Sequence, residues 1–366
     1  MIVLREGRVD AVLREWDGAV EVQVSITGGG TCRALAYPRI VGSPQVEDLV
    51  LLNTTALDRG LGTGGYAMVV AIPLRVPVDA PQPCGHLVKA RYTPQQVMVQ
   101  GVDEQGTRFH EAMREADDLT GMPVVVADLH SSLPAVLAGV FAEEPGARVA
   151  YVMSDGGSLP AWFSMTVAGL RRAGWLSACV SAGQAFGGDL EAVGVHSALL
   201  ACRVVLGAQI AVVIQGPGNL GTGTRWGFSG VAVGEAVNAA SVLGGRPVGV
   251  LRLSEADERP RHRGVSHHSL TAYGRVALRP ADLVLPELAG RFGTEVREQA
   301  AALARPRTPH RLVPVPVDGL AEALERCPVR LSTMGRGPGQ DPAAFLAAAA
   351  AGRWAAGLLR GPGRPA

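Results

Sequence analysis

Polar and apolar residues alternate with a period of two in five short runs over the first 73 residues of the chain. Turn residues stand between the runs, including Asp17-Gly18 and the Gly28-Gly29-Gly30 segment. Five short strands at this spacing predict a small all-β barrel of SH3-like or OB-like type over residues 1–73. The expected strands are residues 9–14, 20–26, 32–37, 49–53 and 66–72.

The pattern changes twice after the barrel. Residues 74–106 form a proline-rich joint, together with Pro73, and a hairpin-like pair of apolar runs at 86–92 and 96–102. From residue 107 to 335, apolar strand-like runs alternate with helical runs, which predicts a mostly parallel, layered α/β sheet covered by helices on both faces. We expect strands at 123–127, 148–154, 177–181, 209–215, 247–253, 311–317 and 329–333, and helices at 133–141, 162–173, 190–206, 231–243 and 319–326. Residues 336–366 hold an alanine-rich helix at 342–359 and a terminal tail at 361–366.

Polar residues gather directly after the expected strands. The sequence Ser-Leu-Pro-Ala follows two of them, beginning at Ser132 and at Ser158, and is a typical helix start. Open α/β sheets bind ligands outside the carboxyl ends of their strands. We therefore expect a cleft at this end of the sheet, with Asp128, His130 and Asp155 on its rim.

A glycine-rich loop follows the expected strand at 209–215. Gly216-x-Gly218-x-x-Gly221 formally matches a dinucleotide fingerprint, but the helix does not begin at the third glycine, which disfavours NAD. The chain has no Gly-Lys-Ser/Thr, which disfavours an ATP-binding P-loop. Such a loop can still aim backbone N–H groups at an anion, the alternative being a flexible connection. The expected anion ligands are Gly218, Gly221, Thr222, Gly223 and Thr224, with Arg225 or Arg263 to neutralise charge.

Two adjacent histidines, His267 and His268, are predicted in the first turn of a helix capped by Ser266. The positive end of the helix disfavours protonation there, which leaves neutral imidazole as a base or a metal ligand. Adjacent helix positions diverge by about 100°, so one of the pair is expected to face the cleft. With His130 and Asp155 they are candidates for acid/base catalysis, the alternative for each histidine being a structural hydrogen bond. A divalent metal is a further candidate cofactor, with ligands drawn from Asp128, His130, Asp189 and His267.

One lysine, Lys89, stands among 34 basic residues, and the others are arginines. A compact, titratable amine at this position suggests a charge or proton partner in catalysis, the alternative being a chance survivor of the composition.

The overall charge excludes some partners. The formal net charge is +1, and residues 1–73 hold six arginines against eight acidic residues, so nucleic acid is not an expected partner.

The most apolar stretch, at 193–214, is interrupted by His196 and Arg203 and is not expected to enter a membrane. Five scattered cysteines without a Cys-x-x-Cys, and a charged N-terminal segment, indicate reduced thiols and a cytoplasmic location.

Four segments carry a resemblance to a known family: Gly85-His-Leu-Val-Lys89-x-Arg-Tyr-Thr93, Ala127-Asp-Leu-His-Ser131, Gly218-x-x-Gly-Thr-Gly-Thr224 and Gly264-x-Ser-His-His-Ser269. They resemble a bacterial family described only as a domain of unknown function, and the similarity spans roughly residues 1–335. The resemblance implies no activity.

The combined expectation is an enzyme-like α/β domain whose cleft accepts a small anionic or phosphorylated metabolite, in a chain that could form homo-oligomers. The alternative is a non-catalytic binding or scaffold protein whose barrel engages a macromolecule. The sequence singles out no reaction.

Overall fold

The computed structural model describes residues 1–77, 85–304 and 308–360, and it divides into two units. The first unit consists of Met1–Val99 and Trp162–Ala168, and the second of Gln100–Ala161 and Gly169–Ala366. Pro81 and Pro83 of the expected joint, and the expected tail at 361–366, lie outside the described residues.

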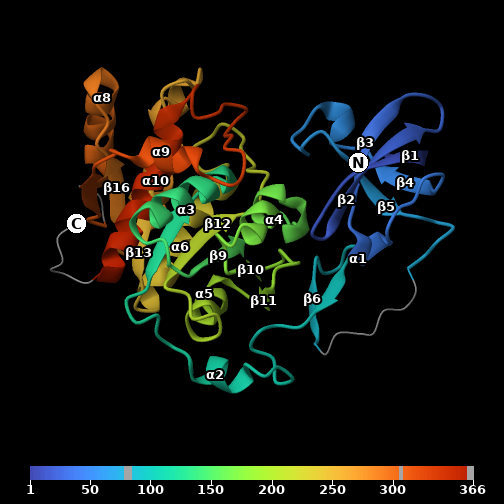
Figure 1. Cartoon of the computed structure of the whole chain (residues 1–366), viewed down its shortest axis with the longest axis horizontal. Helices are drawn as coiled ribbons and strands as arrows, with labels where there is room; N and C mark the ends of the chain where they lie inside the picture. The colour runs from blue at the N-terminus through green and yellow to red at the C-terminus, as the bar shows by residue number, and fades with distance from the viewer. Residues whose placement is uncertain (78–84, 305–307, 361–366) are drawn as a thin grey trace. The chain divides into compact units, whose positions relative to one another are not determined.

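The first unit contains a closed five-stranded barrel, as the alternating pattern predicts (Figure 1). Its strand order is β1-β2-β3-β5-β4, in which β3 pairs with β5 in parallel, and this is the OB-like arrangement. Val22, Val24, Val50 and Leu52 are fully buried inside it because they occupy the inward positions of the alternation. The strands are β1 (Leu4–Trp16), β2 (Ala19–Ile26), β3 (Thr31–Ala36), β4 (Leu49–Asn53) and β5 (Ala67–Ala71), with helix α1 (Pro38–Val41) after β3.

A short hairpin of β6 (Leu87–Lys89) and β7 (Val97–Val99) also belongs to the first unit. Lys89 pairs with Val97 in this hairpin, and its side chain is only 2% exposed. A chance lysine would be expected at the surface, so the burial argues against that interpretation. A catalytic role for the amine stays a prediction.

The second unit is built on an eight-stranded parallel sheet, which confirms the expected α/β fold. The strand order is β11-β10-β9-β12-β8-β13-β16-β17. Every residue of β8 and β12 is buried, as expected for central strands covered on both faces. The strands are β8 (Pro123–Ala127), β9 (Val149–Ser154), β10 (Ala178–Ala182), β11 (Leu190–Ala192), β12 (Ile210–Gln215), β13 (Arg246–Val250), β16 (Asp282–Pro286) and β17 (Arg311–Val315).

Two groups of helices cover this sheet. Helix α3 (Leu133–Glu143) packs against α9 (Leu320–Glu325) and α10 (Pro342–Gly357), whereas α5 (Val195–Val204) packs against α2 (His110–Glu115) and α6 (Ala232–Val242). The chain moves in opposite directions across the sheet after β8 and after β12, so right-handed crossovers put α3 and α6 on opposite faces. The loops after these two neighbouring strands therefore diverge, and such a point is where open α/β sheets form ligand sites. The remaining helices are α4 (Met165–Arg172), α7 (His267–Thr271) and α8 (Gly290–Ala301).

Two expected elements were wrong, and a third begins later than expected. Residues 190–206 are not one helix, because Leu190–Ala192 pairs with β10 as a strand and Gly194 separates it from α5. Residues 329–333 form no strand, since Thr333 instead closes a turn with Arg336. The helix expected at 162–173 is shorter, beginning at Met165 after a single 3-10 turn at Ala161–Phe163. Strand β16 and helix α8 were not predicted at all.

The segment Pro342–Arg360 is long and apolar enough to cross a membrane, the one such helix among the described residues. Its residues Ala347–Ala351 are fully buried, and it packs against α3 and the sheet. This is the position of a core helix inside a folded unit.

Close contact between α3 and α10 depends on two glycines. A Cβ on Gly352 would stand 1.9 Å from the Val136 carbonyl oxygen, and one on Gly139 would stand 1.8 Å from that of Ala349. No side chain fits at either position without separating the helices.

Gly352→Ala should lower the free energy of unfolding by about 1–3 kcal/mol, because the added methyl group overpacks this helix crossing. Gly357→Ala is the matched control in the same helix, since nothing lies within 4 Å of its would-be Cβ. The control should be neutral or slightly stabilising, because alanine is the better helix former. Urea unfolding of both variants measures the difference, and equal effects would show that the two helices do not pack this closely.

Candidate functional site

A buried carboxylate after β8 joins three loops of the second unit. Asp128 Oδ2 lies 3.0 Å from His268 Nδ1 and 3.3 Å from Arg252 Nη1. Burial tends to raise the pKa of Asp128, but the hydrogen bond from His268 and the charge of Arg252 together lower it. The carboxylate is therefore ionised, and it accepts hydrogen bonds from both partners.

Two contacts of opposite kind meet at His268 Nδ1. Arg252 Nη1 also lies 3.0 Å from His268 Nδ1, but a guanidinium can only donate. Nδ1–H can donate to the ionised Asp128 carboxylate, and in this tautomer Nε2 is the nitrogen without a proton. The ring is further held by Phe228, which stacks on it with ring centroids 3.8 Å apart and an interplanar angle of 8°.

A small hairpin brings a third histidine to this pair. Strands β14 (Leu253–Ser254) and β15 (Gly264–Val265) pair in antiparallel fashion, and a 3-10 turn, Pro260–His262, lies in their connection. His262 Nδ1 lies 2.8 Å from the Ser266 hydroxyl, which also caps α7 by accepting from the His268 backbone N–H at 3.2 Å. The expected cap and the placement of His267 and His268 in the first helical turn are thus confirmed.

The three imidazoles form one compact cluster. Their ring centroids are 5.0, 5.0 and 4.5 Å apart, and one ligand atom from each lies within 4.8 Å of the others. Burial lowers the pKa of His262 to about 3 and also lowers the pKa of His267, so both rings are neutral at pH 7. His267 Nε2 is buried and has no hydrogen-bond partner among the described residues.

His267 also lines an open pocket of about 800 Å³. Three arginines and one exposed aromatic side chain line the pocket together with Gly223: Arg225, Arg261, Arg275 and Trp226. None of the described residues that line it is acidic. All three arginines are exposed, and in the described ranges none is paired with a carboxylate. The wall of the pocket is therefore positively charged.

The glycine-rich loop contributes to this pocket with only part of its length. Gly223 and Arg225 line it, and Gly223 adopts a left-handed conformation with φ 77°. The Thr222 and Thr224 hydroxyls lie 3.1 Å apart, and the Thr222 N–H donates to Gly227, so these groups close the loop on itself. Gly218 and Gly221 are exposed and do not line the pocket.

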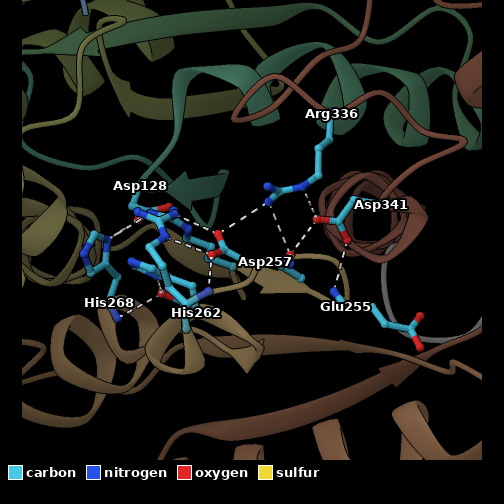
Figure 2. A network of polar contacts seen from close by, with 11 residues as sticks. Asp128, Glu255, Asp257, His262, His268, Arg336 and Asp341 are labelled. Carbon is cyan, nitrogen blue, oxygen red and sulfur yellow. Dashed lines mark hydrogen bonds and ion pairs between the residues drawn. The ribbon is translucent and has the colours of Figure 1, made fainter. Parts of the chain in front are cut away.

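Further polar contacts, around Arg336 and Asp341, involve the loop between β14 and β15 (Figure 2). Arg336 contacts Asp341 at 3.1 Å and Asp257 at 3.4 Å, and Asp341 also accepts from the Glu255 N–H at 3.1 Å. Asp341 is fully buried, at the start of α10. This network fastens the loop that carries His262 to the C-terminal part of the unit.

Four of the predicted site residues have other surroundings. His130 Nδ1 lies 3.2 Å from the Tyr151 hydroxyl, and burial lowers the pKa of His130 to about 4. Asp155 accepts from the N–H groups of Gly157, Ser158 and Gln184, which folds its own loop. Asp189 pairs with Arg171 and binds the Cys179 N–H. Arg263 is exposed and does not line the pocket that contains His267, Arg225, Arg261 and Arg275.

Sequence reasoning missed His262, Arg252, Arg261 and Arg275. His262 and Arg261 lie in a run rich in arginine and histidine, at 259–268, and this density was the available signal. Arg252 lies inside the strand expected at 247–253, whereas the observed strand β13 ends at Val250, and nothing in the pattern distinguishes Arg275.

Comparison with known families agrees with the sequence resemblance. A family described as a protein of unknown function (DUF3866) matches residues 33–352. The chain belongs to the DUF3866 family. The match runs from the third barrel strand to α10, so it covers most of both units of this DUF3866 protein. No curated protein and no solved structure matched it, so its function has to be argued from its own residues.

Acid should weaken the network beside the hairpin through Asp257. Hydrogen bonds from the Arg259 guanidinium hold the pKa of this carboxyl well below its usual range, against the opposing effect of burial. Its contribution to stability is therefore fully present above the unfolded-state pKa of about 3.9 and is lost as the pH falls through the lower folded-state pKa.

Asp257→Asn should accordingly reduce the free energy of unfolding at pH 7 by about 2–3 kcal/mol, since charged hydrogen bonds are lost. The difference from the wild type should shrink below about pH 4. Urea unfolding at pH 7 and pH 3 measures both, with Asp318→Asn at an exposed position as control. A deficit that stays constant or grows in acid would contradict the ion pair.

Proposed function

We propose that this DUF3866 protein is an enzyme that binds a small anionic, phosphorylated metabolite in the arginine-lined pocket. The observation that carries the proposal is the lining itself, in which Arg225, Arg261 and Arg275 meet without a carboxylate among the described residues. Guanidinium groups bind phosphate and carboxylate through paired N–H donors, so unpaired arginines around one concavity favour such an anion.

The pocket also contains a group suited to proton transfer. His267 is the one histidine in the described lining, and it is neutral at pH 7 because burial lowers its pKa. The one unprotonated nitrogen of a neutral imidazole can either accept a proton from the anion or from a water molecule, or bind a metal ion. Trp226 and Leu270 supply apolar surface for the rest of the metabolite.

The size of the pocket fits this class of ligand. Its volume of about 800 Å³ lies within the range of small-molecule sites.

The proposal includes a cytoplasmic location, which is supported by the free thiols of Cys32, Cys179, Cys202 and Cys327.

Titration with inorganic phosphate and pyrophosphate by calorimetry tests the proposal. Arg261→Ala should weaken binding by roughly 10–100-fold, the cost of about 1.5–3 kcal/mol expected for a charged hydrogen bond. Arg263→Ala is the matched control, since Arg263 is exposed, two residues away, and outside the pocket.

The control should bind as tightly as the wild type at the same salt concentration, because general screening affects both variants equally. Equal losses in the two variants would indicate only a diffuse charge effect. Wild-type protein that binds neither anion would exclude the pocket as a phosphate site.

A further inference from the structure

We propose that His262, His267 and His268 together bind one divalent transition-metal ion of the zinc class. The binding of the ion rests on the histidine cluster alone, whereas its use on a substrate rests on the proposed function. The sequence suggested His130 and Asp189 as metal ligands, but both have other partners in the structure. The proposed site contains His262 and His268 instead.

Three features of the cluster support a metal. The rings converge from two segments, the 3-10 turn Pro260–His262 and the start of α7, so that one ligand atom of each lies within 4.8 Å of the others. The Nδ1 atoms of His262 and His268 are occupied by Ser266 and Asp128, which leaves Nε2 of each ring for an ion. Nε2 of His267 is buried without a partner in the described part of the chain, and such a group usually has one.

The outer contacts are those that metal-binding histidines need. An imidazole that binds a metal through one nitrogen commonly donates its other N–H to a carboxylate or hydroxyl, which fixes the tautomer and the ring. Asp128 does this for His268 and Ser266 for His262. Phe228 stacks on His268 and restricts the ring further. Asp128 is thus a positioning residue and not a ligand.

The donor set selects the kind of ion. Imidazole nitrogen suits zinc, copper, nickel and iron, whereas magnesium and calcium prefer oxygen. Three protein ligands leave a fourth tetrahedral position, which is the arrangement of catalytic zinc sites. His267 belongs both to the cluster and to the pocket lining, so the cluster lies at the wall of the pocket.

Nearby charges determine what the fourth position holds. Arg252, Arg259 and Arg261 face the histidines and are opposed by Asp128 and Asp257. With neutral imidazole ligands, the ion would add two positive charges to this environment. An anion at the fourth position, either hydroxide or an oxygen of the metabolite, offsets them, and this links the ion to the arginine-lined pocket.

Cobalt(II) titration of the full chain, after treatment with a chelator, tests the site without any anionic ligand. Wild-type protein should bind one cobalt per chain, with the intense visible absorption of a tetrahedral ion, and zinc should displace it. Asp128→Asn should weaken binding by roughly 10–100-fold, as expected for an outer contact. His262→Gln, His267→Gln and His268→Gln should each weaken it more than that.

His267→Gln is the decisive variant, because its Nε2 makes no hydrogen bond to the described residues and the metal-free melting temperature should stay unchanged. His196→Gln, at an exposed position of α5, is the control and should bind cobalt as the wild type does. Absence of stoichiometric binding by the wild type, or wild-type affinity in a folded His267→Gln variant, would overturn the metal site. Phosphate binding by metal-free protein is a separate readout, so the pocket and the metal site can fail independently.

Discussion

The geometry of the candidate site depends on one buried ionised carboxylate. Asp128 follows β8, Arg252 follows β13 and His268 lies in the first turn of α7, so the carboxylate joins three separate segments of the chain. A buried charge without partners is costly, and here two donors share the carboxylate. Because Arg252 also anchors α7, through its backbone N–H and the Ser269 hydroxyl at 2.9 Å, the same residue sets the direction of the helix. Loss of Asp128 would leave a guanidinium and an imidazole without the group that orients both.

The neutral histidines and the charged arginines near this carboxylate lie in different surroundings. The cluster of three imidazoles is largely withdrawn from solvent, which disfavours protonation, whereas Arg225, Arg261 and Arg275 keep their charges at the exposed pocket wall. His267 is the residue that belongs to both regions. A ligand in the pocket would therefore meet positive charge and an uncharged nitrogen at the same time, which is a useful combination for handling a phosphorylated metabolite.

Much of the fold was predictable because its elements are long and regular. Buried parallel strands such as β8 and β12 are continuous apolar runs, and apolar and polar residues alternate along the barrel strand β2. The site was only partly predictable. Because Ser266 is a typical helix-capping residue, it predicted the start of α7 and so placed His267 and His268 in the first turn of that helix. His262 was not predicted, because it is brought to them by a hairpin with two-residue strands, and two residues carry no periodicity. Arg261 and Arg263 lie in one run of sequence, and only the conformation of the hairpin decides which of them reaches the pocket.

The contact between Asp341 and the hairpin has a consequence for the order in which this chain matures. During synthesis the N-terminal parts of a protein are available first, and the partner of the Glu255 backbone comes 86 residues later. Until Arg336 and Asp341 have left the ribosome, Ser254 and Asp257 cannot complete their buried contacts. The sheet strands β8 to β13 can already pair at that stage, but the loop that holds His262 would still be free. The loop that carries His262 thus completes its contacts only when the segment that begins α10 has been made.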